Sequence, residues 1–254
     1  MQIDRTLSVP TGLTAAYVES WAAILLPTDD ASAQRLGDCV EETDIPVNLR
    51  RRLRPFARMG VTCGLGVAPQ SDADIVFCSR YGDVALAHQL LTSLLEGEPM
   101  SPAGFSMSVH NTVPGVLDLA RKTRIGHTAI AAGTQTLSSG LMEAWLRLAE
   151  RPHLKLVLIF VDTPLPEIYS EVADFDRGGL AFGLRLSAEA DSHAHVSLMR
   201  TQDTGEHGDV LDAPHAELLA REIISRLQGE TLETLRWRSQ GSLWSFEGNT
   251  DAAA

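Results

Sequence analysis

The residues most suited to catalysis lie at Gly133-Thr134-Gln135, directly after a short apolar run. A strand-to-helix turn of this kind places a side chain at a helix N-terminus, where the helix dipole stabilises an anion. Enzymes use that position for cysteine or serine nucleophiles. Here it carries no cysteine, and Ser138 and Ser139 follow more than one turn into the expected helix. The plainer interpretation of this segment is that Thr134 caps the helix.

A Ser/His/Asp hydrolase is an alternative use of the same segment. Its candidate members are Ser138 or Ser139, His110 or His127, and Asp162 or Asp118. No Gly-x-Ser-x-Gly turn accompanies them, and a chain with eight histidines offers some triad by chance. We therefore interpret His110 as a structural or pocket-lining residue.

Metal, disulfide and phosphate sites are not indicated. The cysteines, Cys39, Cys63 and Cys78, form no CxxC pair and are odd in number, so we expect reduced thiols. His193 and His195 would share one strand face, but no third ligand accompanies them, which favours a solvated face. The glycines between residues 60 and 66 lack phosphate-loop spacing and indicate flexible or closely packed backbone. We expect no metal and no cofactor.

Composition excludes further classes of function. The chain has 21 Lys and Arg against 33 Asp and Glu, and its net charge of −12 disfavours binding to nucleic acid. Its most apolar run, residues 156–161, is far shorter than the ~20 residues that a membrane span needs. The N-terminus has no basic region followed by an apolar stretch, so we expect a cytoplasmic protein.

Strands that alternate with helices surround these residues. Residues 17–26 fit a strand or a short helix, and Asn48 is suited to capping a short helix. The remaining pattern predicts strands at 74–79, 128–132, 156–161, 180–186, 195–199 and 243–246, and helices at 84–95, 113–122, 134–150 and 217–227. This alternation predicts a layered α/β fold, and the late strands favour a mixed sheet.

One run of motifs resembles the N-terminal half of β-ketoacyl synthases. It consists of Asn111-Thr-Val-Pro-Gly115, then Arg124, then the expected strand and helix between 128 and 150. The arginine-rich residues 49–53 and the strand at 75–78 resemble landmarks further upstream in that family. The resemblance covers roughly residues 45–200. It implies a thiolase-like fold with a mixed β-sheet packed by helices, in a single truncated domain over residues 1–254 whose C-terminal helix and short strand occupy 211–248.

The sequence departs from that family at the nucleophile. The position of the family's acylated cysteine is Thr134 here, or Gln135 if the alignment shifts by one residue. A threonine hydroxyl is not ionised near neutral pH and needs a dedicated base, and Cys78 belongs to another strand. The chain is also too short for the family's second half, which supplies two histidines. It thus resembles the chain-length factors of type II polyketide and aryl-polyene ketosynthases, which are non-catalytic.

The resemblance implies a heterodimer with an active β-ketoacyl synthase, in which this chain helps shape the acyl-chain pocket in polyketide, fatty-acid-like or aryl-polyene biosynthesis. Acyl carrier protein would interact with this chain only indirectly, through that partner. The residues implied at the partner interface and acyl pocket are Asn111, Val113, Val116, Leu117, Thr128, Ala129, Ile130, Ala131, Ala132 and Gly133. Those implied at the pocket edge are Phe175, Asp176 and Gly179, unless they form a plain turn. Equally, Val113, Val116, Leu117 and Leu119 would fit the chain's own core.

Two other functions remain open from the sequence. The first is an independent acyltransferase, decarboxylase or condensing enzyme that uses Thr134 with a histidine. The second is an acyl-binding scaffold module that meets no ketosynthase.

Overall fold

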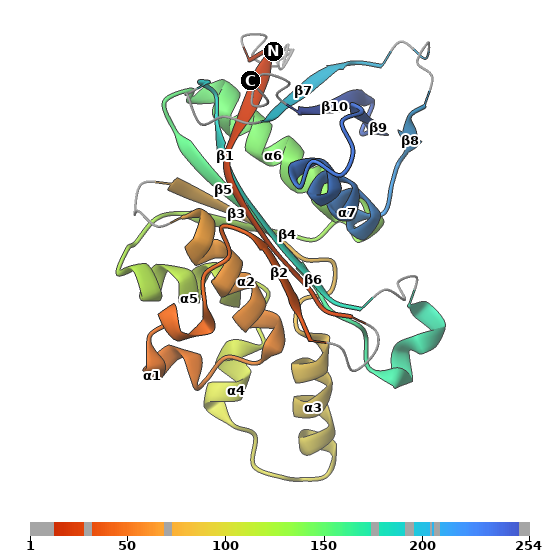
Figure 1. Cartoon of the computed structure of the whole chain (residues 1–254). Coiled ribbons are helices and arrows are strands. Elements are labelled where there is room, and N and C mark those ends of the chain that lie inside the picture. Colours follow the sequence, from red (N-terminus) through yellow and green to blue (C-terminus); the bar gives the residue numbers. More distant parts are fainter. Residues whose placement is uncertain are drawn as a thin grey trace, which may run out of the picture.

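The structure, a computed structural model, describes residues 13–27, 32–68, 73–173, 178–190, 196–203, 205 and 209–248 (Figure 1). The strands are β1 (Ala15–Leu25), β2 (Gln34–Gly37), β3 (Ala73–Cys78), β4 (His127–Ile130), β5 (Lys155–Asp162), β6 (Leu180–Ser187), β7 (Val196–Gln202), β8 (Leu211–Asp212), β9 (Leu235–Ser239) and β10 (Ser242–Gly248). The α-helices are α1 (Val47–Arg50), α2 (Pro55–Val67), α3 (Val84–Leu95), α4 (Pro102–Met107), α5 (Thr112–Arg121), α6 (Thr136–Glu150) and α7 (Ala216–Leu227). Short 3-10 turns are η1 (Glu42–Asp44), η2 (Gly133–Gln135) and η3 (Glu167–Val172).

All of these strands form one mixed sheet of ten strands, in the order β4-β3-β5-β6-β1-β7-β10-β9-β8, with β2 paired to β1. β3 is parallel to both β4 and β5, whereas β6 is antiparallel to β5 and to β1. The expected layered α/β architecture with a mixed sheet is confirmed. Residues 17–26, which fitted a strand or a helix, lie almost wholly in β1, where apolar side chains contact both layers of helices.

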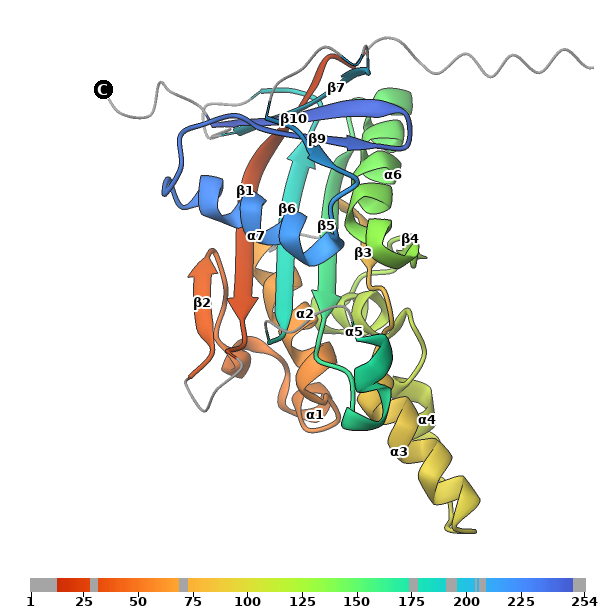
Figure 2. The same cartoon turned by 90° about the vertical axis from the view of Figure 1, so that its right-hand side faces the viewer.

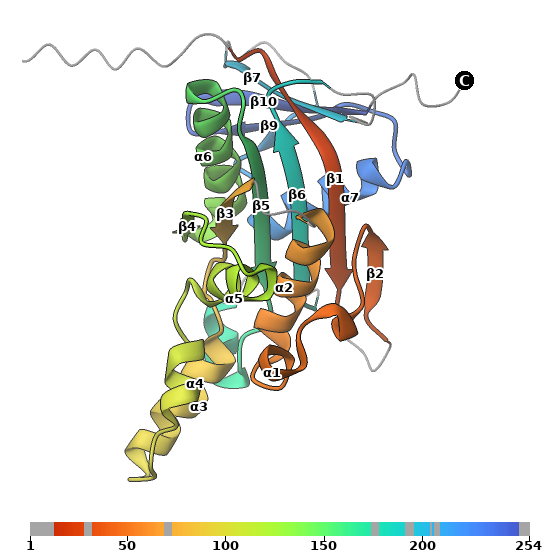
Figure 3. The ribbon, with the colours of Figure 1, turned by 90° about the vertical axis from the view of Figure 1, so that its left-hand side faces the viewer.

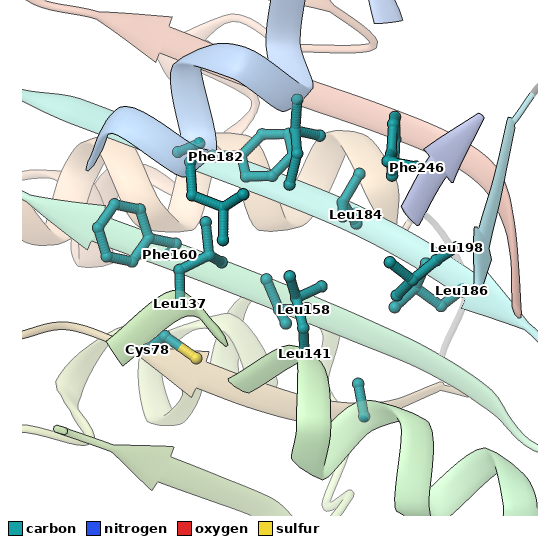
Figure 4. Close-up of a cluster of buried hydrophobic side chains, with 14 of the residues drawn as sticks. Cys78, Leu137, Leu141, Leu158, Phe160, Phe182, Leu184, Leu186, Leu198 and Phe246 are labelled. Carbon is teal, nitrogen blue, oxygen red and sulfur yellow. The ribbon is translucent and has the colours of Figure 1, made fainter. Parts of the chain in front are cut away.

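Helices cover both faces of the sheet, which explains the continuous apolar run of β5. Leu156, Leu158 and Phe160 face α6 and α7, whereas the residues between them face α2 and α5. Figure 4 shows part of the first cluster, where Leu137 and Leu141 of α6 lie over β5 and β6. A strand buried on both faces does not alternate between polar and apolar residues, so it is recognised in the sequence only as a continuous apolar run.

The glycine-rich residues 60–66 are closely packed backbone, the second of the two expected readings, and they lie inside α2. A Cβ at Gly60 would lie 2.8 Å from Val113 and Val161 side-chain atoms, and one at Gly64 would lie 2.8 Å from Ile159 and Leu117. The glycines therefore let α2 approach both the sheet and α5. The predicted cap at Asn48 is wrong, because Asn48 lies within α1, which starts after Pro46.

The C-terminal strands extend the sheet over α6. Trp145 of α6 and Trp244 of β10 meet edge to face at 5.8 Å, and Trp237 of β9 stacks on Trp244 at 5.8 Å. Figure 2 shows β9 and β10 running past the end of α6. This contact joins the C-terminal segment to the rest of the single sheet.

One pair of helices projects from the body of the molecule. α3, whose bounds match the sequence prediction, and α4 extend below the sheet in Figures 2 and 3. Of the residues in α3, Leu86 is the one classed as buried, and α4 has no buried residue. These helices expose large apolar side chains at the same time, namely Leu91, Leu94, Leu95 and Phe105.

Candidate functional site

The turn after β4 forms the expected strand-to-helix junction, but its cap differs from the prediction. Gly133 adopts φ +57°, a left-handed conformation that glycine reaches at little cost, and η2 precedes α6. The hydroxyl of Thr136 accepts a hydrogen bond from the Ala132 N–H (3.0 Å) and donates one to the Gly133 carbonyl (2.6 Å). Thr136, rather than Thr134, thus holds the backbone where α6 begins, and the interpretation of Thr134 as the cap is wrong.

The side chain of Gln135 is hydrogen-bonded to the C-terminal segment. Its amide donates to the carbonyls of Ala213 (2.8 Å) and Pro214 (3.1 Å). Its carbonyl oxygen accepts a hydrogen bond from the Ser239 hydroxyl at 3.0 Å. These three hydrogen bonds give Gln135 a structural role. Local sequence patterns do not reveal this role, because the bonding partners lie about 80 and 100 residues away.

Thr134 borders a small cavity where parallel strands end. Among the residues that line the cavity are Arg80, Tyr81, Thr134, Asp162, His215 and Glu217. Arg80 follows β3, Thr134 follows β4, and Asp162 ends β5, so the cavity lies at the carboxyl edge of the parallel strands, where α/β proteins place their sites. Its volume of about 30 Å³ is room for roughly two water molecules.

Asp162 is a buried acid at this site with a raised pKa. It is 8% exposed, and its Oδ1 accepts hydrogen bonds from the Ser79 hydroxyl and from the Arg80 N–H, both at 2.9 Å. The Ser79 hydroxyl in turn accepts from the Gly82 N–H at 2.9 Å. Burial raises the pKa of Asp162 to about 6, although these donors and the Arg80 charge oppose the rise.

Cys78 has no access to this cavity as a nucleophile. It is fully buried on β3, and a Cβ at Gly140 of α6 would lie 2.1 Å from its sulfur, so the two elements are in tight contact (Figure 4). Burial raises the pKa of the Cys78 thiol, chiefly because the thiolate would be desolvated there. The thiol is a core group.

The residues of the hypothetical hydrolase triad do not converge on a catalytic arrangement. The Ser138 hydroxyl is buried without a hydrogen-bond partner among the described residues, and Ser139 accepts a hydrogen bond from the Gln240 side chain at 2.7 Å. His110 Nε2 lies 2.8 Å from the Ser79 carbonyl, and its ring packs against Phe77 at 5.5 Å. These contacts give His110 the structural role that we expected.

The expected partner surface is divided between the edge of the sheet and the core. β4 is the last strand on its side of the sheet, and Ala129, Ala131 and Ala132 are exposed there. The Asn111 amide lies 3.4 Å from His127 Nε2, which joins the start of α5 to this edge.

The expected partner residues Val113, Val116 and Leu117 are instead at most 3% exposed, in the cluster that α5 shares with α2 and the sheet. We therefore withdraw these three side chains from the partner surface. Their neighbour Leu119 is 63% exposed.

The expected pocket edge is only partly described. Phe175 and Asp176 lie outside the described residues, as do His193 and His195. Gly179 accepts a hydrogen bond at its carbonyl from the Leu26 N–H (2.7 Å) and packs on the Leu26 side chain, so it serves the start of β6.

The described residues contain no cluster of three or more metal-ligating side chains. Within the same part of the chain, no helix is long and apolar enough to cross a membrane.

Comparison with known proteins identifies the family of this chain. The family described as the β-ketoacyl synthase N-terminal domain matches residues 20–246. The chain belongs to that family.

Among solved structures, a ketosynthase (ApeO) in complex with its chain length factor (ApeC) from Xenorhabdus doucetiae is similar, with a TM-score of 0.69 and 23% identity over 92% of this chain and 99% of the matched chain. The ishigamide ketosynthase/chain length factor matches with a TM-score of 0.60 and 11% identity, over 92% and 99% of the two chains. A ketosynthase from module 6 of the bacillaene synthase from Bacillus subtilis 168 matches with a TM-score of 0.51 and 12% identity, over 85% of this chain but 46% of that one. No curated protein sequence matches the chain.

Proposed function

We propose that this chain is a non-catalytic ketosynthase-like subunit, a chain-length factor, that forms a heterodimer with an active β-ketoacyl synthase and completes the pocket for the growing acyl chain. The observation that carries the proposal is the junction after β4. It has the geometry of a nucleophile turn, yet Thr134 and Gln135 occupy it and Cys78 is buried on another strand. A threonine hydroxyl without a dedicated base is a poor acyl acceptor.

The surface of the chain supports the role of a subunit. β4 presents an open strand edge, which proteins cover or protect because unpaired backbone groups invite pairing (Figure 3). The exposed side chains at 129 on β4 and at 131 and 132 directly after it are alanine, so a second backbone can approach closely. Lone soluble domains normally protect such an edge with charge or bulk.

The projecting helices α3 and α4 supply the apolar part of the proposed interface. Leu95 is 87% exposed, Leu94 57% and Phe105 57%. Several large apolar side chains gathered on one projection mark a surface that a partner covers. We assign α3, α4 and the β4 edge to the ketosynthase partner, with carrier protein engaged through that partner.

The first experiment is co-expression of the chain with a β-ketoacyl synthase encoded beside it, followed by gel filtration and a chain-extension assay. We expect a 1:1 complex whose activity is lost when this chain is omitted. Thr134→Ala should retain most of that activity, since the hydroxyl does no chemistry in this role. A chain that remains a monomer beside every ketosynthase tested would overturn the proposal.

A matched pair of variants tests the assigned surface. Leu95 and Leu232 are 87% and 86% exposed, but Leu232 lies between α7 and β9, away from α3. Leu95→Glu should weaken the complex about 10-fold or more, because burying a leucine contributes about 1.5–3 kcal/mol. Leu232→Glu should leave its affinity unchanged. Equal effects of the two variants would contradict the assignment of α3 to the interface.

The cavity favours one alternative, an independent acyl-transfer enzyme. Thr134, His215 and Asp162 all line it, as a hydroxyl, a base and an acid would in such an enzyme. This alternative requires turnover of an acyl thioester by the purified chain alone, lost in both Thr134→Ala and His215→Ala. Turnover that survives Thr134→Ala, or that is absent from the start, would exclude it.

A further inference from the structure

Two of the three cysteines lie next to each other although they are far apart in the sequence. Cys39 is half-buried in the segment between β2 and η1, and Cys63 is fully buried in the middle of α2. Cys39 packs against the apolar cluster that contains Cys63, and each of the two thiols shifts the pKa of the other. Neither thiol takes part in the cavity beside Thr134 or in the proposed partner surface.

Gly66 explains why the two cysteines come so close. A Cβ at Gly66 would lie 2.2 Å from the Asp38 carbonyl oxygen and 3.4 Å from the Cys39 Cα. The backbone of α2 therefore touches the segment that carries Cys39. Cys63 lies three residues before Gly66, on the same face of the helix and one turn nearer its N-terminus, which directs its side chain to Cys39.

The surroundings make the two thiols unequal. The interaction with Cys63 lowers the pKa of Cys39, and the charge of Arg35 adds to this effect, whereas burial and Glu41 oppose it. Burial raises the pKa of Cys63, and the Cys39 thiol raises it further. Arg35 is held in place by ion pairs with Glu41 (2.7 Å) and Glu42 (3.4 Å). Cys39 is thus the more reactive and more accessible thiol, with a second thiol behind it.

We propose that Cys39 and Cys63 form a reversible modification site, which a small peroxide oxidises to an intramolecular disulfide in the folded chain. The Cys39 thiolate attacks the O–O bond of hydrogen peroxide, takes one oxygen as a sulfenic acid and releases hydroxide, which becomes water with a proton from solvent. The Cys63 sulfur then displaces hydroxide from the Cys39 sulfur, and the proton of Cys63 converts it to water. Two thiols are oxidised to one disulfide while one peroxide is reduced to two waters.

The test treats the folded full-length chain with one equivalent of hydrogen peroxide and then alkylates the remaining thiols in denaturant. We expect the free thiols to fall from three to one, with Cys78 the survivor, and a peptide pair linked through Cys39 and Cys63 to appear in the mass spectrum. Dithiothreitol should restore all three. The oxidised chain should also unfold at a higher temperature than the reduced chain, because the disulfide lowers the conformational entropy of the unfolded chain.

Single variants separate the two steps. In Cys63→Ser, oxidation should stop at a Cys39 sulfenic acid, which a cyclic 1,3-dione traps. In Cys39→Ser, peroxide should be consumed at least 10-fold more slowly. Cys78→Ala is the matched control, and it should form the linked pair at the wild-type rate.

Three outcomes would overturn the proposal. The linked pair could form only after denaturation, or Cys39 could be oxidised equally in wild type and Cys63→Ser without any link. The third is Cys78 reacting as fast as Cys39 in the folded chain. Circular dichroism of each variant distinguishes a chemical effect from loss of the fold.

Discussion

At the scale of single residues, Asp162 connects the elements that form the candidate site. Its carboxylate joins the end of β5 to the loop after β3, through Ser79 and the Arg80 N–H. That loop places Arg80 and Tyr81 in the lining of the cavity that Thr134 also borders. A buried carboxylate is tolerated there because donors satisfy it, yet its desolvation is only partly offset, and its pKa remains raised.

This raised pKa predicts a pH-dependent stability. The pKa of Asp162 is about 6 in the folded chain against 3.8 in an unfolded one, so folding favours the protonated form. The stabilisation is fully present below pH ~4 and is lost as the pH rises through about 6, at about 1.4 kcal/mol per pKa unit. Asp162→Asn lacks this titration while its amide oxygen still accepts from Ser79. Its stability relative to wild type should therefore rise by up to about 3 kcal/mol from pH 4 to pH 7.

Urea unfolding of both proteins at pH values from 4 to 8 measures this difference directly. Other titrating groups are common to the two proteins and cancel in the comparison. Ser79→Ala should move the wild-type transition to higher pH, because it removes a donor that stabilises the carboxylate. Parallel stability curves for wild type and Asp162→Asn would show that Asp162 does not titrate in this range.

At the scale of elements, amphipathic and fully apolar segments were predictable, whereas the glycine-containing helix α2 was not. The helix at 84–95 and the strand around 156–161 follow from apolar spacing and run length. Helix α2 was missed because glycines at 60, 64 and 66 are typical of a loop in the sequence. In the structure, neighbouring atoms occupy the positions that their Cβ atoms would take. Only part of the cavity lining was predictable. The strand-to-helix pattern indicates Thr134, whereas His215 reaches the cavity because α7 packs there in the tertiary structure.

Two helical glycines should respond in opposite directions to alanine. A Cβ at Gly115 of α5 meets nothing within 4 Å, so Gly115→Ala should stabilise the isolated chain by about 0.5–1 kcal/mol through helix propensity. A Cβ at Gly66 of α2 would meet the Asp38 carbonyl at 2.2 Å, so Gly66→Ala should cost about 1–3 kcal/mol. Chemical denaturation of the two variants gives both values. Destabilisation by Gly115→Ala would mean that α5 is packed more tightly than the structure has it.

At the scale of the whole molecule, the sheet has helices over both faces, and its two ends differ. At one end β8 is two residues long, so it offers little backbone for pairing. At the other end β4 is an open parallel strand, and α6 covers one of its faces (Figure 2). The projecting α3 and α4 lie on the same side of the molecule as β4 in Figure 3, so one partner could contact both. An interface of this kind, apolar and built on a strand edge, fits a permanent complex rather than a transient one.

This arrangement predicts that a charge on the β4 edge weakens assembly without harming the fold. Ala129 is exposed on β4, and a lysine there would place an ammonium group in the proposed interface, as natural edge strands do to prevent pairing. Ala129→Lys should therefore weaken the complex with the ketosynthase at least 10-fold and leave the isolated chain's melting temperature unchanged. Ala33→Lys makes the same chemical change at an exposed alanine beside β2, on the other side of the sheet, and should assemble as wild type does. Sedimentation of each variant with the partner measures both effects. If Ala129→Lys assembles normally, the partner does not use this edge, and α3 and α4 must carry the interface alone.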